Sequence, residues 1–561
     1  RQHTVTCHFC NWLFILIVHL VNRSCFLIFC FCHDFTLFLC QATDADTVRT
    51  RSTRNTTSGN ASHADKTRSA YTILPMSAKG VYKWSAIDRV CNSVITFTGN
   101  IVMARLLTPD DFGLLAMVAI FTAIAYNLSG CGMSDGLIHK AKPTERDYST
   151  VFVFNGAFGL FFAIVFSAAA HPLSLFFERP QIEGIMYAIA VCFFFQTLSF
   201  TQETRMRKNL DMKRMCIVRL SATITSLVVG IVLILMGYGY WGLVSTHIFL
   251  SFFLFVYYVT ISRWMPRIAF YRDSFKEMFG YGIHLMIAFV TVQIGRNINT
   301  MVLGKFISPA SSGIYSQGQK LEEVPYAITE SVFNWPFFAV LSNEQNHTKR
   351  QQLCRDMHVR LWTLNIAVGA FLLLVSWPAF NVLYGSKWDA AVPVFRILIA
   401  YGIVSSMKFF YQSAMKAYNR TKMMRNLTVI EVGLQLALLA IFFRHGIEMV
   451  ALTQVIAAII ICIAHAWYYK KIMEFTVRQM LGEFVHSAYI PTIAFAGSAA
   501  LATLWYNTLH PVANCVLLCI AFAAAYIGIC AIVRPPYYTA ALDMIKAKLY
   551  RRNRTNNNIQ A

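Results

Sequence analysis

Apolar stretches of similar length alternate with short polar segments along most of the chain. From Trp84 onward there are fourteen such stretches, each close to the roughly 20 residues that a helix needs to cross a bilayer. They cover approximately residues 84–104, 112–132, 149–170, 183–201, 216–237, 240–262, 279–304, 323–342, 360–382, 390–415, 426–443, 447–469, 486–506 and 512–533. The pattern predicts an all-α polytopic membrane protein with about 14 transmembrane helices.

Composition favours a membrane protein over several soluble domains. Of the 561 residues, 56% are hydrophobic and only 14% are charged, which is far from the average of soluble proteins. The formal net charge is +22, but the Lys and Arg residues lie mostly in short loops between the apolar stretches. Such residues orient helices and contact anionic headgroups, so we expect membrane lipids as partners and no nucleic acid.

Positive charge is concentrated in alternate loops. The loops after even-numbered stretches carry 24 Lys and Arg residues. The loops after odd-numbered stretches carry six, which are Arg105, Arg179, Lys305, Lys320, Lys387 and Arg444. Because cytoplasmic loops are enriched in Lys and Arg, the alternation predicts an even number of helices with both termini in the cytoplasm.

A short motif occurs twice, 200 residues apart. Thr108-Pro109 is followed by Gly113 after the first stretch, and Ser308-Pro309 is followed by Gly313 after the seventh. Six helices lie between equivalent points, so the two halves should have the same orientation in the membrane. The repeat predicts two parallel six-helix bundles and two further C-terminal helices. Two such bundles can rock about a central site, as alternating access requires.

These features divide the chain into five parts. We expect two six-helix bundles over residues 76–276 and 277–475, two additional transmembrane helices over 476–533, and a basic cytoplasmic tail over 534–561. Residues 1–75 contain no methionine and differ in composition from the remainder of the chain, so we expect them to be a non-native upstream extension. The alternative is an extra membrane segment with a polar linker.

Enzymatic motifs are absent from the sequence. There is no Gly-x-x-x-x-Gly-Lys-Ser/Thr phosphate loop, no His-Glu-x-x-His and no Gly-x-Ser-x-Gly. The loops between the apolar stretches are short, which disfavours a large extracytoplasmic catalytic domain. We therefore predict no catalytic residue, no metal site and no cofactor, and we expect that the chain is not an enzyme.

Polar residues within the seventh stretch are the strongest candidates for a binding site. Gln293, Arg296, Asn297 and Thr300 have helical spacing and share one face. Ionisable residues at membrane depth usually face the protein interior and serve function. A guanidinium there could bind a diphosphate through two parallel hydrogen bonds. The alternative is a structural ion pair between Arg296 and Glu330.

Other polar residues at membrane depth extend this candidate site. Lys408 and Gln412 share a face of the tenth stretch, and Arg89 lies near one end of the first. We include all three among the candidate cavity residues. The carboxylates Asp88, Glu330 and Glu431 are candidates for ion coupling, although each could instead neutralise a neighbouring cation.

Several of these segments resemble a known family of transporters. The resemblance is carried by residues 80–84, 104–114, 132–138, 237–244 and 313–316, which read GVYKW, ARLLTPDDFGL, GMSDGLI, GYGYWGLV and GIYS. Together they are similar to the polysaccharide transport proteins of the multidrug/oligosaccharidyl-lipid/polysaccharide (MOP) exporter superfamily, and most of all to the Wzx-type flippases. The similarity extends from Met76 to about Phe475.

The resemblance implies two six-helix bundles in a V-shaped pair. It also implies transport of undecaprenyl-diphosphate-linked repeat units of O-antigen, capsule or exopolysaccharide from the cytoplasmic to the periplasmic leaflet of a bacterial inner membrane. A polysaccharide polymerase and assembly proteins would be partners. Many relatives carry an acidic residue in the seventh helix where this chain has Asn299, so an ion-coupling role at that position is in doubt.

Two other functions fit parts of the sequence. A drug or cation antiporter could share the fold, but it should present acidic residues to its cavity, whereas Arg296 and Lys408 are basic. A membrane polysaccharide polymerase or ligase would be expected to have a long extracytoplasmic loop. Both are less consistent with the sequence than a flippase.

Overall fold

The computed structural model describes residues 78–535 and 538, except residues 130–132, 141, 263, 331–332, 334, 419, 474 and 506–508. The predicted extension over 1–75 lies outside the described residues, as does Met76. The predicted tail over 534–561 also lies outside them, apart from Arg534, Pro535 and Tyr538. Within the described part of the chain all regular secondary structure is helical, as predicted.

Fourteen described helices have 21 residues or more. They are α2 (Ala78–Leu106), α3 (Pro109–Ser129), α5 (Glu145–Phe177), α6 (Gln181–Lys208), α7 (Met212–Leu235), α8 (Tyr240–Ser262), α9 (Arg272–Phe306), α10 (Pro309–Thr329), α12 (His347–Tyr384), α13 (Ala391–Ala417), α14 (Thr421–Phe442), α15 (Ile447–Met473), α16 (Val477–Ala502) and α17 (Pro511–Val533). The shorter elements are α4 (Met133–His139), α11 (Trp335–Asn343) and the 3-10 helices η3 (Ser386–Trp388) and η4 (Phe443–His445).

Eleven of these long helices are apolar enough by composition to cross a membrane. Of the three others, α2 and α10 carry polar residues along much of their length, whereas residues 279–289 and 291 of α9 lie outside those whose side chains the structure describes. The exact number of 14 spans therefore stays a prediction, while the all-α, multi-pass architecture is established.

The predicted boundaries of the eighth helix are wrong. The sequence placed this helix at 323–342, but the structure has α10 from Pro309 to Thr329 and a separate short α11. The Ser308 hydroxyl accepts a hydrogen bond from the Ser311 amide and thereby caps the start of α10. Most of α10 before residue 321 is polar, so hydropathy alone displaced the prediction toward the next apolar segment.

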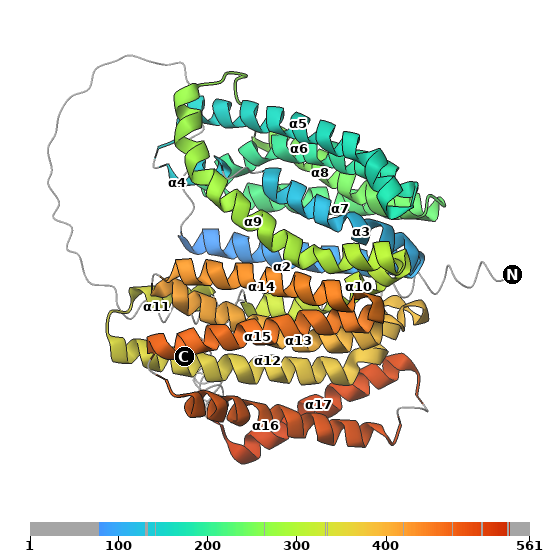
Figure 1. Ribbon diagram of the computed structural model, residues 1–561, viewed down its shortest axis with the longest axis vertical. Coiled ribbons are helices and arrows are strands. Elements are labelled where there is room, and N and C mark those ends of the chain that lie inside the picture. The colour runs from blue at the N-terminus through green and yellow to red at the C-terminus, as the bar shows by residue number, and fades with distance from the viewer. Residues whose placement is uncertain are drawn as a thin grey trace, which may run out of the picture. The chain divides into compact units, whose positions relative to one another are not determined.

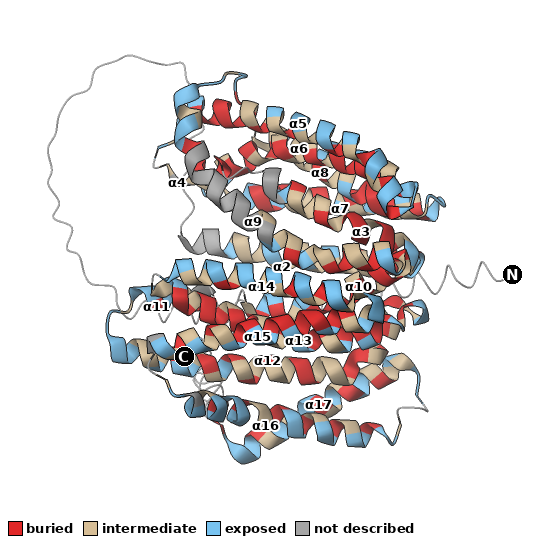
Figure 2. Ribbon diagram, in the orientation of Figure 1, coloured by how far each residue is buried: buried red, intermediate tan, exposed pale blue. Residues whose placement is uncertain are grey.

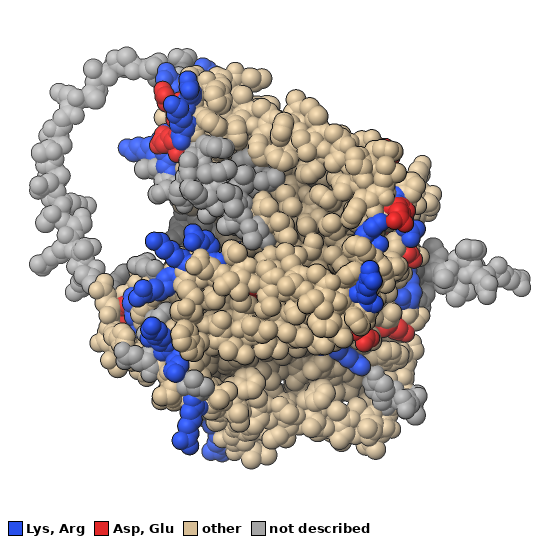
Figure 3. Space-filling view, viewed as in Figure 1, with Lys and Arg blue, Asp and Glu red and all other residues tan. Residues whose placement is uncertain are grey.

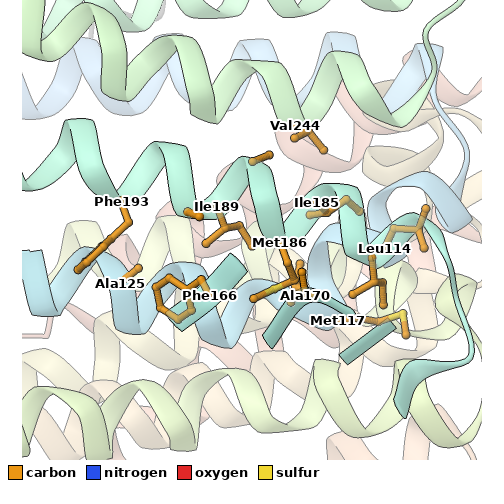
Figure 4. Close-up of a cluster of buried hydrophobic side chains, with 14 of the residues drawn as sticks. Leu114, Met117, Ala125, Phe166, Ala170, Ile185, Met186, Ile189, Phe193 and Val244 are labelled. Carbon is orange, nitrogen blue, oxygen red and sulfur yellow. The ribbon is translucent and has the colours of Figure 1, made fainter. Parts of the chain in front are cut away.

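The helices from α2 to α8 form a first group around an apolar core. Contacts join α5 to α6, α7 to α8, α6 to α8 and α2 to α7. Buried side chains of α3, α5, α6 and α8 interlock, among them Met117, Phe166, Met186, Phe193 and Val244 (Figure 4). This core fixes the positions of the helix faces that line the cavity described below.

The helices from α10 to α15 form a second group. Here α13 contacts α10, α12 and α15, and α14 contacts α15. Helices α16 and α17 pack against α12, at the outer edge of this group (Figure 1). Helix α9 belongs to neither group alone, because it contacts α3, α4 and α5 of the first group as well as α10 and α14 (Figure 1).

Apolar side chains on the outer helix faces are exposed. On α5 these include Leu160, Phe161 and Ile164, each more than half exposed, and on α17 they include Val516 and Ile520. Figure 2 shows exposed residues along the outward sides of both helices. Figure 3 shows Lys and Arg gathered at the two ends of the helices, with a broad band nearly free of charge between them. An uncharged band with exposed apolar side chains is the surface that a bilayer core would cover.

The two copies of the repeated motif lie against each other. A Cβ atom on Gly113 would lie 1.8 Å from the backbone oxygen of Pro309, and a Cβ on Gly313 would lie 2.0 Å from that of Pro109. The absence of a side chain at both glycines thus lets the beginnings of α3 and α10 touch through their backbones. The contact is reciprocal, as expected where two related halves meet at a pseudo-two-fold axis.

Further contacts between the two groups gather at the same end. The indole nitrogen of Trp388 donates to the Ala104 carbonyl at 2.9 Å, and the Lys387 ammonium donates to the Arg105 carbonyl at 2.8 Å. The Lys305 ammonium of α9 pairs with Glu178 at the end of α5 at 2.8 Å. One hydrophobic cluster also combines residues of both groups, including Leu107. The two groups are therefore joined at this end.

Candidate functional site

A cavity of about 330 Å³ lies between the two groups of helices. Its apolar wall comes from α3, α6 and α8, where Ile185, Ile189 and Val244 project from the core of the first group (Figure 4). Its polar wall comes from α9 and α10 and consists of Gln293, Arg296, Asn297, Thr300, Ser316, Gln319, Lys320 and Glu323. The cavity is thus apolar on one side and basic and polar on the other.

The four-residue polar face predicted on the seventh helix forms one wall of this cavity. Gln293, Arg296, Asn297 and Thr300 of α9 all line it. The Thr300 hydroxyl donates to the Asn297 carbonyl at 2.8 Å, and the Asn297 amide donates to the Gln293 carbonyl at 3.0 Å. These bonds along the helix satisfy the neutral side chains locally and leave the guanidinium as the strongest donor on this face.

Arg296 has no carboxylate within ion-pair distance among the described residues. Its side chain is exposed toward the cavity, and no ion pair joins it to Glu330. Glu330 lies at the end of α10 and is half-buried, within electrostatic reach of Arg296, Lys416 and Lys408. Among the described residues, Arg296 thus lines the cavity without the ion pair to Glu330 that the structural alternative requires.

Lys320 is a second cation in the cavity, and the sequence did not single it out. The predicted eighth helix begins after Lys320, so the sequence predicts a loop position there, whereas Lys320 lies within α10. Its ammonium lies 3.5 Å from the Asn100 side-chain oxygen and 5.4 Å from the centre of the Phe112 ring. The Ser308-Pro309 helix start would have revealed it, since it places Lys320 three turns into a helix.

Lys408 and Gln412 are not among the residues that line this cavity. Lys408 is buried within the second group, and its ammonium pairs with Glu431 at 2.6 Å. Gln412, one turn further along α13, is buried as well. The sequence expectation that Lys408 shares a cavity with Arg296 is therefore not met, because a carboxylate on the adjacent α14 holds the ammonium instead.

We expect the Lys408–Glu431 pair to stabilise the second group of helices. Replacing Lys408 with Met leaves an unpaired buried carboxylate, which should lower the free energy of unfolding by about 3–5 kcal/mol. The double variant Lys408→Met, Glu431→Gln should recover most of this loss, since it removes both charges. Thermal unfolding of the purified variants measures the effect. Equal destabilisation in the single and double variants would contradict the pairing.

Asp88 is also an ion-pair member and not a free carboxylate. Arg219 of α7 donates to Asp88 at 3.2 Å and to Glu203 at 2.6 Å. Glu203 in addition accepts from Arg207 at 2.6 Å. Arg89 is exposed on α2 and lies outside the described lining of the cavity.

Asn299 lies at the centre of a buried uncharged network. Its amide donates to the Tyr315 hydroxyl at 2.8 Å and to the Gln454 side-chain oxygen at 3.0 Å. Its oxygen accepts from Gln435 at 3.3 Å. All the polar atoms of the amide are thus used within the protein, in agreement with the doubt about a coupling role here. Among the described residues no cluster of three or more His, Cys, Asp or Glu could hold a metal ion.

Comparison with known proteins places the chain in a family. The polysaccharide biosynthesis protein family matches residues 102–393. The chain is 20% identical over 327 residues to the teichuronic acid biosynthesis protein TuaB of Bacillus subtilis, covering 57% of this chain and 67% of TuaB. It is also 20% identical over 341 residues to the lipopolysaccharide biosynthesis protein WzxC of Escherichia coli, covering 58% of this chain and 67% of WzxC.

Two solved structures share the fold. The lipid II flippase MurJ in its inward closed conformation superposes with a TM-score of 0.64, at 14% identity, over 81% of this chain and all of MurJ. An inward-facing multidrug resistance MATE family transporter of the MOP superfamily gives 0.57, at 13% identity, over 70% of this chain and 98% of that one. Both neighbours are transporters, in agreement with the prediction that the chain is not an enzyme. The chain is a multi-pass membrane protein that has the MOP transporter fold and belongs to the polysaccharide biosynthesis protein family.

Proposed function

We propose that this protein moves undecaprenyl-diphosphate-linked oligosaccharide repeat units from the cytoplasmic to the periplasmic leaflet of a bacterial inner membrane. The observation that carries the proposal is the cavity between the two groups of helices, in which Arg296 and Lys320 project from adjacent helices. Relatives named for teichuronic acid, succinoglycan and lipopolysaccharide biosynthesis support a precursor of this class as the substrate.

The charge of the cavity suits a diphosphate. Moving such a group away from water is costly unless cations and hydrogen-bond donors replace its hydration. The Arg296 guanidinium offers a planar pair of donors, and the Lys320 ammonium of the adjacent α10 adds a point charge. Glu323 is the only carboxylate among the described lining residues. An antiporter of organic cations would require the opposite balance of charge.

In alternating access, the end at which the two groups of helices are joined would act as a gate. In this state α3 and α10 touch through Gly113 and Gly313, and Phe112, next to Gly113, lines the cavity. We propose that the protein opens there when the oligosaccharide is released, as the bundles rock about the cavity.

Among the three candidate carboxylates, Glu330 is the best candidate for ion coupling. Asp88 and Glu431 are each held by a cation at 3.2 Å or less. Glu330 has no such partner among the described residues, and it lies within electrostatic reach of Arg296. A carboxylate that is not permanently paired can exchange a proton or a sodium ion as the substrate arrives.

We expect both termini and the basic loops to be cytoplasmic. Lys142, Arg207, Lys349 and Lys471 are exposed at helix ends or loops and provide four test positions. Single cysteines at these positions should be protected from impermeant maleimides in intact cells and should react after permeabilisation. Labelling of any one of them from the periplasm would contradict the proposed orientation.

Complementation tests the proposed function in cells. Expression should restore surface polysaccharide in a host that lacks its own flippase and retains its polymerase and assembly proteins. Accumulation of lipid-linked repeat units on the cytoplasmic side, despite correct insertion of the protein, would contradict the proposal.

A further inference from the structure

A second cavity, of about 260 Å³, lies inside the first group of helices. It adjoins the Arg296 cavity, because Thr122, Ile189, Cys192 and His247 line both. Helices α2, α3, α6, α7 and α8 all contribute to its wall. Its volume suits one sugar ring and is too small for a whole oligosaccharide. Asn92, which belongs to a polar stripe of Asp88, Asn92, Thr96 and Asn100 on the first predicted helix, lies in its wall.

Hydrogen bonds within the wall leave two amide groups available. The Thr223 hydroxyl donates to the Asn92 side-chain oxygen at 2.9 Å, and the Ser251 hydroxyl donates to that of Gln196 at 3.3 Å. No described residue accepts a hydrogen bond from the amide nitrogen of Asn92 or of Gln196. The cavity therefore presents NH₂ donors, which match the hydroxyl and acetamido oxygens of a sugar.

The cavity has a balanced charge. Arg219 is the only Lys, Arg, Asp or Glu among the described residues that line it. Its guanidinium is held by Asp88 at 3.2 Å and by Glu203 at 2.6 Å, and Arg207 balances the second carboxylate. A carboxylate on an entering sugar would lose its hydration and would find no unpaired cation to form an ion pair with.

Aromatic side chains complete the wall. Tyr126 and Phe193 line the cavity from α3 and α6, and the Tyr126 ring meets Phe200 edge-on at 5.9 Å. Rings of this kind offer a flat apolar surface to the C–H face of a sugar, while the Tyr126 hydroxyl adds a polar tip. Donors on one side and aromatic rings on another are the usual composition of a small polar-ligand site.

We propose that this second cavity binds the sugar adjacent to the diphosphate and selects an uncharged ring, through the Asn92 and Gln196 amides and the balanced charge around Arg219. This inference rests on the proposed function, which places the diphosphate in the adjoining Arg296 cavity. An N-acetylhexosamine fits these requirements, whereas a uronic acid does not.

Transport in proteoliposomes tests the selection directly. The probes are undecaprenyl diphosphate carrying N-acetylglucosamine and the same lipid carrying glucuronic acid. We expect the neutral probe to be moved at least about tenfold faster, because a buried unpaired carboxylate lacks the hydrogen bonds that it makes in water. Gln196→Met removes the amide at similar length and should reduce neutral transport by about tenfold. Asn426→Asp is a control, because Asn426 is an exposed residue of α14, and it should leave transport unchanged.

The outcomes separate this inference from the function on which it rests. Equal rates for the two probes, or full activity of Gln196→Met, would overturn the neutral-sugar site and leave the flippase function standing. Transport of neither probe by the wild-type protein would overturn both. Should Gln196→Met fold poorly, Asn92→Leu provides a second variant. It removes the donor without adding a charge, so it should reduce neutral transport in the same way.

Discussion

Arg296→Glu should abolish transport of the lipid-linked oligosaccharide. The variant replaces a cation on the cavity wall with an anion, so an attraction to the diphosphate becomes a repulsion in a site with little water. A charge-assisted hydrogen bond contributes about 1.5–3 kcal/mol, so its loss together with the added repulsion should reduce the rate by more than about 100-fold. The rate is measured in proteoliposomes at matched protein levels.

Two further variants define what Arg296 contributes. Arg296→Lys keeps the charge but loses the planar pair of donors, so it should retain partial activity. Arg444→Glu is a matched control, because Arg444 is exposed in η4 outside the described cavity lining. Full activity of the double variant Arg296→Gln, Glu330→Gln would contradict the binding role, since it would show that the two side chains only balance each other.

Gly113→Val should also cause a large loss of transport. Its Cβ would lie 1.8 Å from the Pro309 oxygen and 2.3 Å from the Pro309 carbonyl carbon, and both atoms belong to the backbone of α10. The beginnings of α3 and α10 must separate to admit the side chain. Overpacking of this kind costs about 1–3 kcal/mol, so the population of the joined state should decrease about tenfold or more.

A labelling experiment distinguishes separation of the helices from unfolding. Leu107 is buried in the cluster that joins the two groups at this end, so a cysteine there should be protected in the parent protein. We expect Gly113→Val to expose it to an impermeant maleimide. Gly433→Val is the control, because a Cβ at Gly433 meets nothing within 4 Å. Wild-type transport by Gly113→Val, with Leu107→Cys still protected, would contradict a role for this contact in gating.

Much of the architecture could be predicted from the sequence because membrane-length apolar stretches leave few alternatives. The start of α10 shows where this method fails. Helices that face an interior cavity carry polar residues, so hydropathy is lowest in the part of the chain that matters most for binding. That is why α2 and α10, which each line one of the two cavities, carry polar residues along much of their length.

Helical spacing within a single helix accounts for the part of the candidate site that lies on α9. Gln293, Arg296 and Asn297 are brought together by helical spacing alone, and all three line the cavity. Lys408 and Asp88 depend instead on which helices are neighbours. Their partners Glu431 and Arg219 lie 23 and 131 residues away in the sequence, and periodicity within one helix carries no information about them.

Asn92 illustrates the same limit in another way. It belongs to a polar stripe on the first helix, but its importance depends on Gln196 and Arg219, which line the same cavity from α6 and α7. Only the packing of the first group of helices brings these side chains to one cavity. The proposed neutral-sugar site could therefore not be predicted from the sequence.

The most direct test of the flippase function is a transport assay on the purified protein. Undecaprenyl-diphosphate-linked oligosaccharide with a fluorescent sugar is placed in both leaflets of proteoliposomes, and a membrane-impermeant reagent quenches the outer leaflet. With the wild-type protein we expect the protected fraction to fall as the inner pool crosses, and with Arg296→Glu we expect it to stay constant. A protected fraction that stays constant with the wild-type protein, correctly inserted and supplied with a proton or sodium gradient of either direction, would contradict the function.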